Sequence, residues 1–123
     1  MYKMELRPWG FFKTLYKDEH KFQVKTIVVF PLKRLSLQSH QHRSEHWVVV
    51  KGTARIQVGD DIHILNENQH VYIPKCTLHR MENISDKDNL EIIETQIGTY
   101  IAEDDIIRYE DDYGRIQQSS SMP

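Results

Sequence analysis

The chain has 123 residues, which is room for one compact domain with a single core. Its 16 Lys and Arg and 18 Asp and Glu are interspersed and give a formal net charge of -2, so we expect no nucleic-acid partner. No apolar run approaches a membrane span, the N-terminus lacks a secretory signal, and Cys76 is the only cysteine; we therefore expect a cytoplasmic protein without a membrane partner.

Short runs rich in Val, Ile, Tyr, Phe and Thr recur from residue 9 to residue 97, and Gly, Asn, Asp or Pro interrupts them. This pattern is typical of an antiparallel sandwich or barrel, so the fold class we predict is all-β. Gly59-Asp60 lies between two alternating runs and predicts a hairpin. The expected strands cover residues 9–16, 22–30, 35–40, 45–51, 53–58, 61–65, 70–73, 78–83 and 90–97.

The composition changes after Gly98 and becomes acidic and rich in tyrosine, with AEDDIIRYEDDYGR at residues 102–115. We expect this segment to form a short helix or an extended arm folded across the barrel. Residues 117–123 are expected to be a disordered tail. Since we find no linker and no long repeat, we predict a single domain over residues 1–116.

Four polar residues have the spacing of a metal site. Alternation along a strand puts Gln38 and His40 on one face. Glu45 follows a span suited to a loop and begins the next strand, and His79 begins a later strand. Two imidazole nitrogens, one carboxylate and one amide oxygen suit a divalent ion such as zinc, nickel, cobalt, manganese or iron(II). We therefore predict Gln38, His40, Glu45 and His79 as metal ligands.

The spacing of these residues resembles the two cupin motifs over most of residues 32–83. Leu32 and Cys76 stand where the family has glycine, and neither adopts a positive φ as readily as glycine, so we expect the turns there to differ in detail. The places of the first motif are taken by Leu32, Gln38, His40, Glu45 and Gly52, and those of the second by Asn68, Pro74, Cys76, His79 and Asn83.

A second register for the site remains open. It would use His40-x-His42 as the motif pair and His46 as the third ligand, and it gives up the alignment of Gly52. The structural alternative is that these histidines lie on the surface or are hydrogen-bonded in the core, as a lone histidine usually is.

One subfamily is matched more closely than the cupins at large. The segments RPWG at 7–10, LSLQSHQHRSEHWVVVKGTA at 35–54, YIP at 72–74, HR at 79–80 and EDDIIRYEDDYGR at 103–115 resemble type II phosphomannose isomerase nearly end to end. In that family the domain often forms the C-terminal part of a bifunctional mannose-1-phosphate guanylyltransferase/mannose-6-phosphate isomerase. This sequence has no glycine-rich nucleotide loop, so the resemblance implies the isomerase activity alone.

The resemblance implies a cupin jelly-roll barrel with a short C-terminal arm or helix, acting in GDP-mannose and polysaccharide biosynthesis. It also implies zinc as the metal, because phosphomannose isomerases use this glutamine-containing ligand pattern for zinc. A homodimer is expected as well, since cupin barrels leave sheet edges that often pair between subunits. The alternatives are a non-catalytic sugar-binding or regulatory cupin and a metal-dependent dioxygenase.

Interconversion of mannose 6-phosphate and fructose 6-phosphate needs a base, an electrophile and a cationic site for phosphate. The metal would be the electrophile. Glu94 is the candidate base, because the apolar face of its strand continues to it; His42 and His46 compete with it, and an ion pair with Arg80 or another arginine is its structural alternative. Arginine binds phosphate through bidentate hydrogen bonds. The candidates for substrate binding are Arg43, Arg80, Arg108 and Arg115, with Arg7 weaker.

Overall fold

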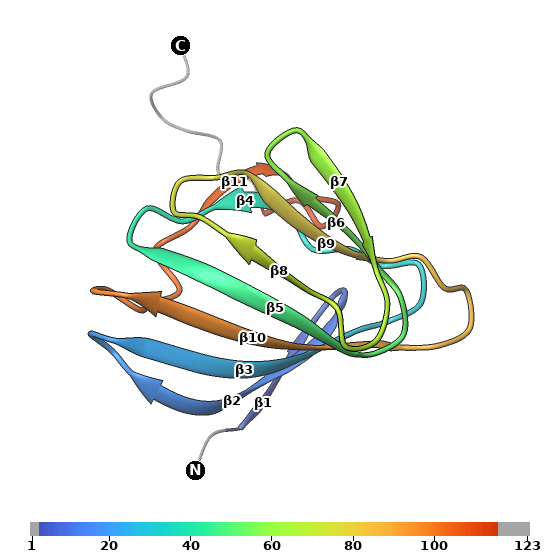
Figure 1. Cartoon of the computed structure of the whole chain (residues 1–123), viewed down its shortest axis with the longest axis horizontal. Coiled ribbons are helices and arrows are strands. Elements are labelled where there is room, and N and C mark those ends of the chain that lie inside the picture. Colours follow the sequence, from blue (N-terminus) through green and yellow to red (C-terminus); the bar gives the residue numbers. More distant parts are fainter. Residues whose placement is uncertain (1–2, 116–123) are drawn as a thin grey trace.

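The structure is a computed structural model that describes residues 3–115, and within them it consists of strands in two sheets (Figure 1). The larger sheet has the order β1-β2-β3-β10-β5-β8 and the smaller one β11-β4-β9-β6-β7. The strands are β1 (Met4–Arg7), β2 (Gly10–Asp18), β3 (Phe22–Val29), β4 (Leu37–Ser39), β5 (Arg43–Lys51), β6 (Ala54–Val58), β7 (Asp61–Leu65), β8 (His70–Ile73), β9 (His79–Asn83), β10 (Leu90–Gly98) and β11 (Ile107–Glu110).

The all-β prediction and the nine expected strands are confirmed, with their ends shifted by a few residues. The hairpin is also confirmed, since Val58 pairs with Asp61 across Gly59-Asp60. Sequence reasoning missed β1 and β11. The segment for which we expected a helix or an arm contains β11, which pairs with β4, and no helix forms there. The expected tail at 117–123 lies outside the described residues.

The neighbouring strands β10 and β3 change from apolar to polar at the same level of the barrel. The inward side chains of β10 are buried, as are those opposite them on β3. Because one register shift would turn every side chain to the other face, this pairing fixes which groups line the interior. One end of the interior is therefore an apolar core and the other a polar cavity. The inward pairs are Leu90 with Val29, Ile92 with Ile27, Glu94 with Lys25, and Gln96 with Gln23.

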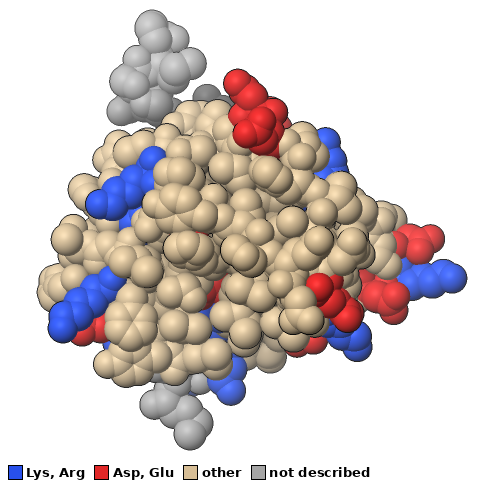
Figure 2. Space-filling model, in the orientation of Figure 1, with Lys and Arg blue, Asp and Glu red and all other residues tan. Residues whose placement is uncertain are grey.

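The outer face of the larger sheet carries few charged groups. Figure 2 shows that Lys, Arg, Asp and Glu gather mainly at the edges of the face over β3, β10 and β5. Exposed side chains on this side include Val48, Val50 and Ile97. This face offers no charged cluster for an ionic ligand, whereas the interior has one. Within residues 3–115 no helix is long and apolar enough to cross a membrane.

Three residues in turns keep the left-handed backbone that glycine favours. Leu32 and Cys76 both have φ 61° and Asn68 has φ 72°. Leu32 and Cys76 therefore adopt the conformation that glycine takes most readily, and the expectation that these turns differ in detail from those of the family stays a prediction. A non-glycine residue held in this region costs on the order of 1 kcal/mol, so these turns carry strain.

We expect Leu32→Gly to raise the free energy of unfolding by about 0.5–1 kcal/mol, because it relieves this strain while adding some unfolded-state entropy. Leu32 is 64% exposed, so little packing is lost. Lys33 is exposed and lacks a positive φ, so Lys33→Gly should destabilise the fold by a similar amount. Urea denaturation measures both variants, and equal destabilisation by the two would contradict the prediction.

Candidate metal centre

A cavity of about 410 Å³ opens at the polar end of the barrel and is lined by side chains of both sheets. This volume lies in the range of small-molecule sites. Seven Lys and Arg side chains and four Glu side chains line it. The excess of positive charge favours an anionic ligand of small-molecule size.

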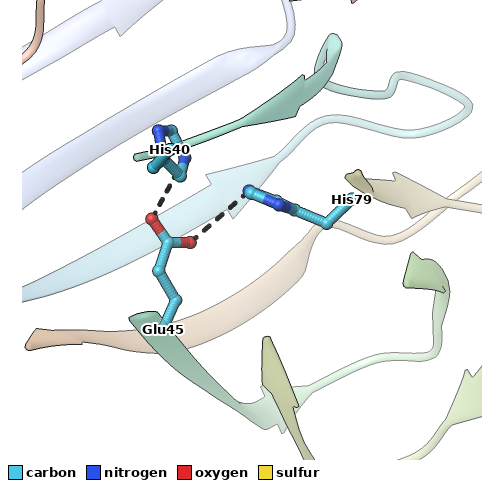
Figure 3. A group of neighbouring side chains, drawn as sticks. All are labelled: His40, Glu45 and His79. Carbon is cyan, nitrogen blue, oxygen red and sulfur yellow. Dashed lines mark ion pairs between the residues drawn. The ribbon is translucent and has the colours of Figure 1, made fainter. Parts of the chain in front are cut away.

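Three buried side chains converge on the cavity from different elements. Glu45 lies on β5 and His79 on β9, whereas His40 lies in the loop after β4. Glu45 Oε2 is 3.2 Å from His40 Nε2, and Glu45 Oε1 is 3.8 Å from His79 Nε2. Figure 3 shows the carboxylate between the two imidazoles. The candidate ligand atoms all lie within 4.8 Å of one another, which is close enough for one ion.

Both imidazoles are held in the tautomer that a metal ligand needs. His40 Nδ1 is 2.6 Å from the backbone oxygen of Asp105, and His79 Nδ1 is 2.9 Å from that of Thr77. A carbonyl oxygen only accepts a hydrogen bond, so Nδ1 carries the proton. Each Nε2 then keeps its lone pair on the side of Glu45, where an ion would lie between them. Burial lowers the pKa of His40 to about 4 and also lowers the pKa of His79, so both rings are neutral at pH 7.

Glu45 is ionised inside the barrel. Burial alone would raise its pKa. The nearby His40, Arg43 and His79 lower the pKa by more than burial raises it, so the net shift is downward. Arg43 Nε and Trp47 Nε1 donate hydrogen bonds of 2.8 and 2.9 Å to its carboxylate oxygens. Two neutral imidazoles and one carboxylate fit a divalent transition ion. Arg43 Nη2 also donates to His40 Nε2 at 3.2 Å, so an ion at this site would compete with the contacts of Arg43.

Gln38, the remaining predicted ligand, lines the same cavity and pairs in register with His79. Its Nε2 donates to Ser36 Oγ at 3.1 Å. The amide oxygen is therefore the atom that Gln38 can offer to an ion. Its role as the fourth ligand stays a prediction.

His42 and His46 do not line the cavity. His42 is exposed, with its ring 5.7 Å from that of Tyr100. His46 follows Glu45 on β5, so alternation turns it to the outer face, where its ring lies 4.8 Å from that of Tyr72. The structure therefore gives no geometric basis to the alternative register or to either histidine as the base.

Glu94 faces the cavity and is 6% exposed. Burial raises its pKa to about 7, and the charge of Glu45 acts in the same direction, while Lys25, Arg43 and a hydrogen bond from Gln96 oppose the rise. Gln96 Nε2 donates that bond at 2.6 Å. The suggested ion pair with Arg80 is absent, because Arg80 pairs with Glu110 at 3.1 Å.

The wall next to Glu94 holds polar residues that sequence reasoning missed. Gln23 Nε2 donates to Gln96 Oε1 at 2.8 Å, and Thr14 Oγ1 donates to Gln23 Oε1 at 3.3 Å. The Lys25 ammonium lies 4.1 Å from the centroid of the Phe12 ring. The alternation in FQVKTIVV, which places Gln23 and Lys25 on the face of Ile27 and Val29, is the signal that could have found them.

The candidate arginines differ in whether an acidic side chain already forms an ion pair with them. Arg43 pairs with Glu45, Arg80 with Glu110 and Arg115 with Asp111. Arg7 lies 3.4 Å from Glu103. All of them line the cavity.

Arg108 lines the cavity without such an ion pair among the described residues. Its Nε is the one buried side-chain nitrogen or oxygen in residues 3–115 without a hydrogen-bond partner. Burial lowers the pKa of Arg108, and the charge of Arg115 adds to this effect. A buried donor without a partner is costly, so Arg108 is the guanidinium best placed to gain from an anion.

Comparison with known proteins gives close sequence relatives and a fold. Alginate biosynthesis protein AlgA of Pseudomonas aeruginosa is 52% identical over 109 residues, which are 89% of this chain and 22% of that protein. Mannose-1-phosphate guanylyltransferase ManC of Salmonella typhimurium is 45% identical over 116 residues, 94% of this chain and 24% of that protein. The chain thus spans less than a quarter of these relatives.

An RmlC-like cupin from Shewanella frigidimarina superposes with a TM-score of 0.73 at 19% identity, over 84% of this chain and 87% of that one. The predicted cupin fold is confirmed. The family model described as Mannose-6-phosphate isomerase C-terminal matches residues 1–111, most of the sequence. The chain therefore belongs to the Mannose-6-phosphate isomerase C-terminal family.

Proposed function

We propose that this chain is a metal-dependent isomerase that interconverts mannose 6-phosphate and fructose 6-phosphate. The observation that carries the proposal is that one cationic cavity holds both a two-histidine, one-carboxylate cluster and the buried carboxyl group of Glu94, whose pKa is about 7. The family match and the name of the ManC relative point to phosphorylated mannose. GDP-mannose and polysaccharide biosynthesis is the setting we propose.

Glu94 is the proposed base. A carboxyl group with a pKa near 7 is partly ionised at neutral pH, so it can accept a proton and also return it. It would take the proton from C2 of the aldose and return it to C1 to give the ketose, while a second proton moves between the oxygens on these two carbons. Gln96 donates to Glu94 and so orients its carboxylate.

A divalent ion, which we propose to be zinc, would be held by His40, Glu45 and His79 with Gln38 as the fourth ligand. When bound, it would supply Lewis-acid stabilisation of the negative charge that develops on the substrate oxygens. Hydrogen bonds to Asp105 and Thr77 hold the two imidazoles, so the protein contributes a donor set that is already oriented.

The proposed phosphate site is centred on Arg108, with Arg43, Arg80 and Arg115 around the same cavity. Losing a hydrogen-bonded charge pair costs about 1.5–3 kcal/mol. We therefore expect Arg108→Met to raise KM for mannose 6-phosphate about 10- to 100-fold with little change in metal affinity.

The matched control for this variant is Arg55→Met. The side chain of Arg55 is 43% exposed, pairs with Glu82, and does not line the cavity. Steady-state kinetics on both variants measures the effect. An unchanged KM in Arg108→Met, or an equal rise in Arg55→Met, would remove Arg108 from the phosphate site.

The activity itself is tested by incubating the purified chain with mannose 6-phosphate and, in turn, zinc, cobalt, nickel or manganese. Formation of fructose 6-phosphate is then coupled to a dye. Turnover with at least one of these ions is expected. Protein that binds the ion and the sugar phosphate but gives no turnover would instead support the non-catalytic sugar-binding alternative.

We also propose a homodimer in a reducing, cytoplasmic setting. Strands β1, β8 and β7 lie at sheet edges within residues 3–115, and exposed edges favour pairing with another chain. The exposed thiol of Cys76 suits a reducing compartment. Light scattering coupled to gel filtration tests the oligomeric state.

A further inference from the structure

His40 differs from the other two members of the cluster in how the fold supports it. Glu45 and His79 belong to strands β5 and β9, whose ladders fix their backbones. His40 lies between β4 and β5, outside either strand. Its position therefore depends on contacts made by the connecting loop.

The backbone oxygen of His40 accepts a 2.7 Å hydrogen bond from Cys76 N–H, and Arg43 bonds its ring. The remaining contacts come from one residue, Asp105, in the segment between β10 and β11. Its backbone oxygen accepts a 2.6 Å hydrogen bond from His40 Nδ1. Its carboxylate oxygens accept hydrogen bonds from the backbone N–H groups of Gln41, at 2.9 Å, and His42, at 3.0 Å. Three consecutive residues of the loop are thus tied to one buried acidic residue, which is 6% exposed.

These hydrogen bonds restrain both the backbone of the loop and the ring of His40. Without the carboxylate, the N–H groups of Gln41 and His42 would lose their acceptor within the protein, and because both residues are exposed they would bond water instead. Hydrogen bonds from backbone N–H to a carboxylate are also stronger than those between neutral groups. The carboxylate therefore fixes the loop, and the adjacent carbonyl fixes the tautomer and direction of the imidazole.

We propose that Asp105 is a positioning residue for the metal centre, which holds His40 in the orientation in which Nε2 faces Glu45 and His79. The segment between β10 and β11 is in this way part of the centre, although it contributes no ligand. The inference rests on the proposed metal site and does not depend on the isomerase reaction.

The test compares Asp105→Ala and Asp105→Asn with Asp104→Ala as the matched control. Asp104 is the neighbouring acidic residue, is exposed, and accepts a hydrogen bond from the Tyr100 hydroxyl at 2.6 Å. Affinity for Co²⁺ is measured by calorimetric titration of metal-free protein. Mutation of groups that orient metal ligands typically costs 10- to 100-fold in metal affinity.

We expect that loss for Asp105→Ala. A smaller loss is expected for Asp105→Asn, which keeps one accepting oxygen, and wild-type affinity is expected for Asp104→Ala. If Asp105→Ala fails to fold in a thermal melt, Asp105→Asn carries the comparison. Equal affinity of Asp105→Asn and Asp104→Ala would overturn the proposal.

A second readout separates positioning from a general loss of stability. In ¹⁵N-histidine spectra of the metal-free protein, the wild type should show His40 protonated at Nδ1. Asp105→Ala keeps the backbone oxygen that accepts from His40 Nδ1 but removes the two side-chain acceptors that hold the loop against it. This variant should therefore mix the two tautomers at His40, and Asp105→Asn should do so to a smaller extent, while His79, held by Thr77, stays unchanged. An unchanged His40 pattern in Asp105→Ala would contradict the proposal. This readout needs no bound metal, so a wild type that binds no metal would by itself reject only the metal centre.

Discussion

Replacing Glu94 by Gln is expected to lower kcat for mannose 6-phosphate by about 100- to 10,000-fold, the usual contribution of a general base. Glutamine has nearly the same shape and can still bond Gln96, but it cannot accept the substrate proton. The metal cluster does not include Glu94, so metal affinity should change little. A loss of turnover with metal binding retained would identify Glu94 as the proton acceptor.

Glu91→Gln is the matched control, because it makes the same chemical change on the same strand. Glu91 precedes the inward-facing Ile92 on β10 and so has the opposite orientation. We expect its kcat to remain within a factor of about two of the wild type, as for surface changes that touch no special feature. If Glu94→Gln keeps wild-type kcat, or if Glu91→Gln loses as much, another residue is the base.

The pH dependence of the two proteins should differ in a defined direction. The pKa of Glu94 is raised to about 7, so its carboxylate form, which is the base, disappears as the pH falls through 7. The activity of the wild type should therefore rise between pH 6 and pH 8. The residual activity of Glu94→Gln should lack this rise, and kcat measured across the range tests both.

The same shift predicts how stability depends on pH. A raised carboxyl pKa means that the fold favours the protonated form, so the stability contributed by protonated Glu94 is present below about 4.5 and is lost as the pH rises through about 7. Glu94→Gln cannot lose a proton. Its stability relative to the wild type, measured by urea denaturation, should therefore increase between pH 5 and pH 8.

Alternation along strands accounts for most of what could be predicted. It predicts that Gln38 and His40 share one face of a strand and that Glu94 faces the interior, because a two-residue period needs only a correct strand assignment. The same rule, applied to residues 22–29, would have found Gln23 and Lys25. What was missing was the register between β3 and β10, which puts their polar ends at one level.

The remaining features depend on contacts that no periodicity records. Asp105 bonds a loop more than sixty positions away in sequence, and a run of acidic residues reads as a solvated surface. Arg108 is distinguished as the candidate phosphate ligand by the ion pairs that the other arginines form. Such assignments follow from side-chain packing in three dimensions, which spacing alone does not determine.

His79→Ala should remove most of the metal affinity and, with it, nearly all turnover. The substitution deletes one of two neutral imidazoles and leaves the buried Glu45 with one histidine beside it. Gln38→Ala should weaken metal binding less, because the two imidazoles and the carboxylate remain and because Ser36 already bonds the amide nitrogen of Gln38. The order of affinities expected is wild type, Gln38→Ala, then His79→Ala.

Thermal melts provide a readout that does not require activity. An ion that binds only the folded state stabilises it by about 2.7 kcal/mol at 100 times its Kd, which for a domain of this size raises Tm by roughly 10 °C. Wild-type protein should show this rise with zinc and lose it with a chelator, and His79→Ala should show almost none. His70→Ala, which removes an exposed histidine from β8, should behave as the wild type. If zinc raises the Tm of His79→Ala as far as that of His70→Ala, the ion binds elsewhere. The buried imidazoles of His40 and His79 would then stabilise the fold without binding the metal.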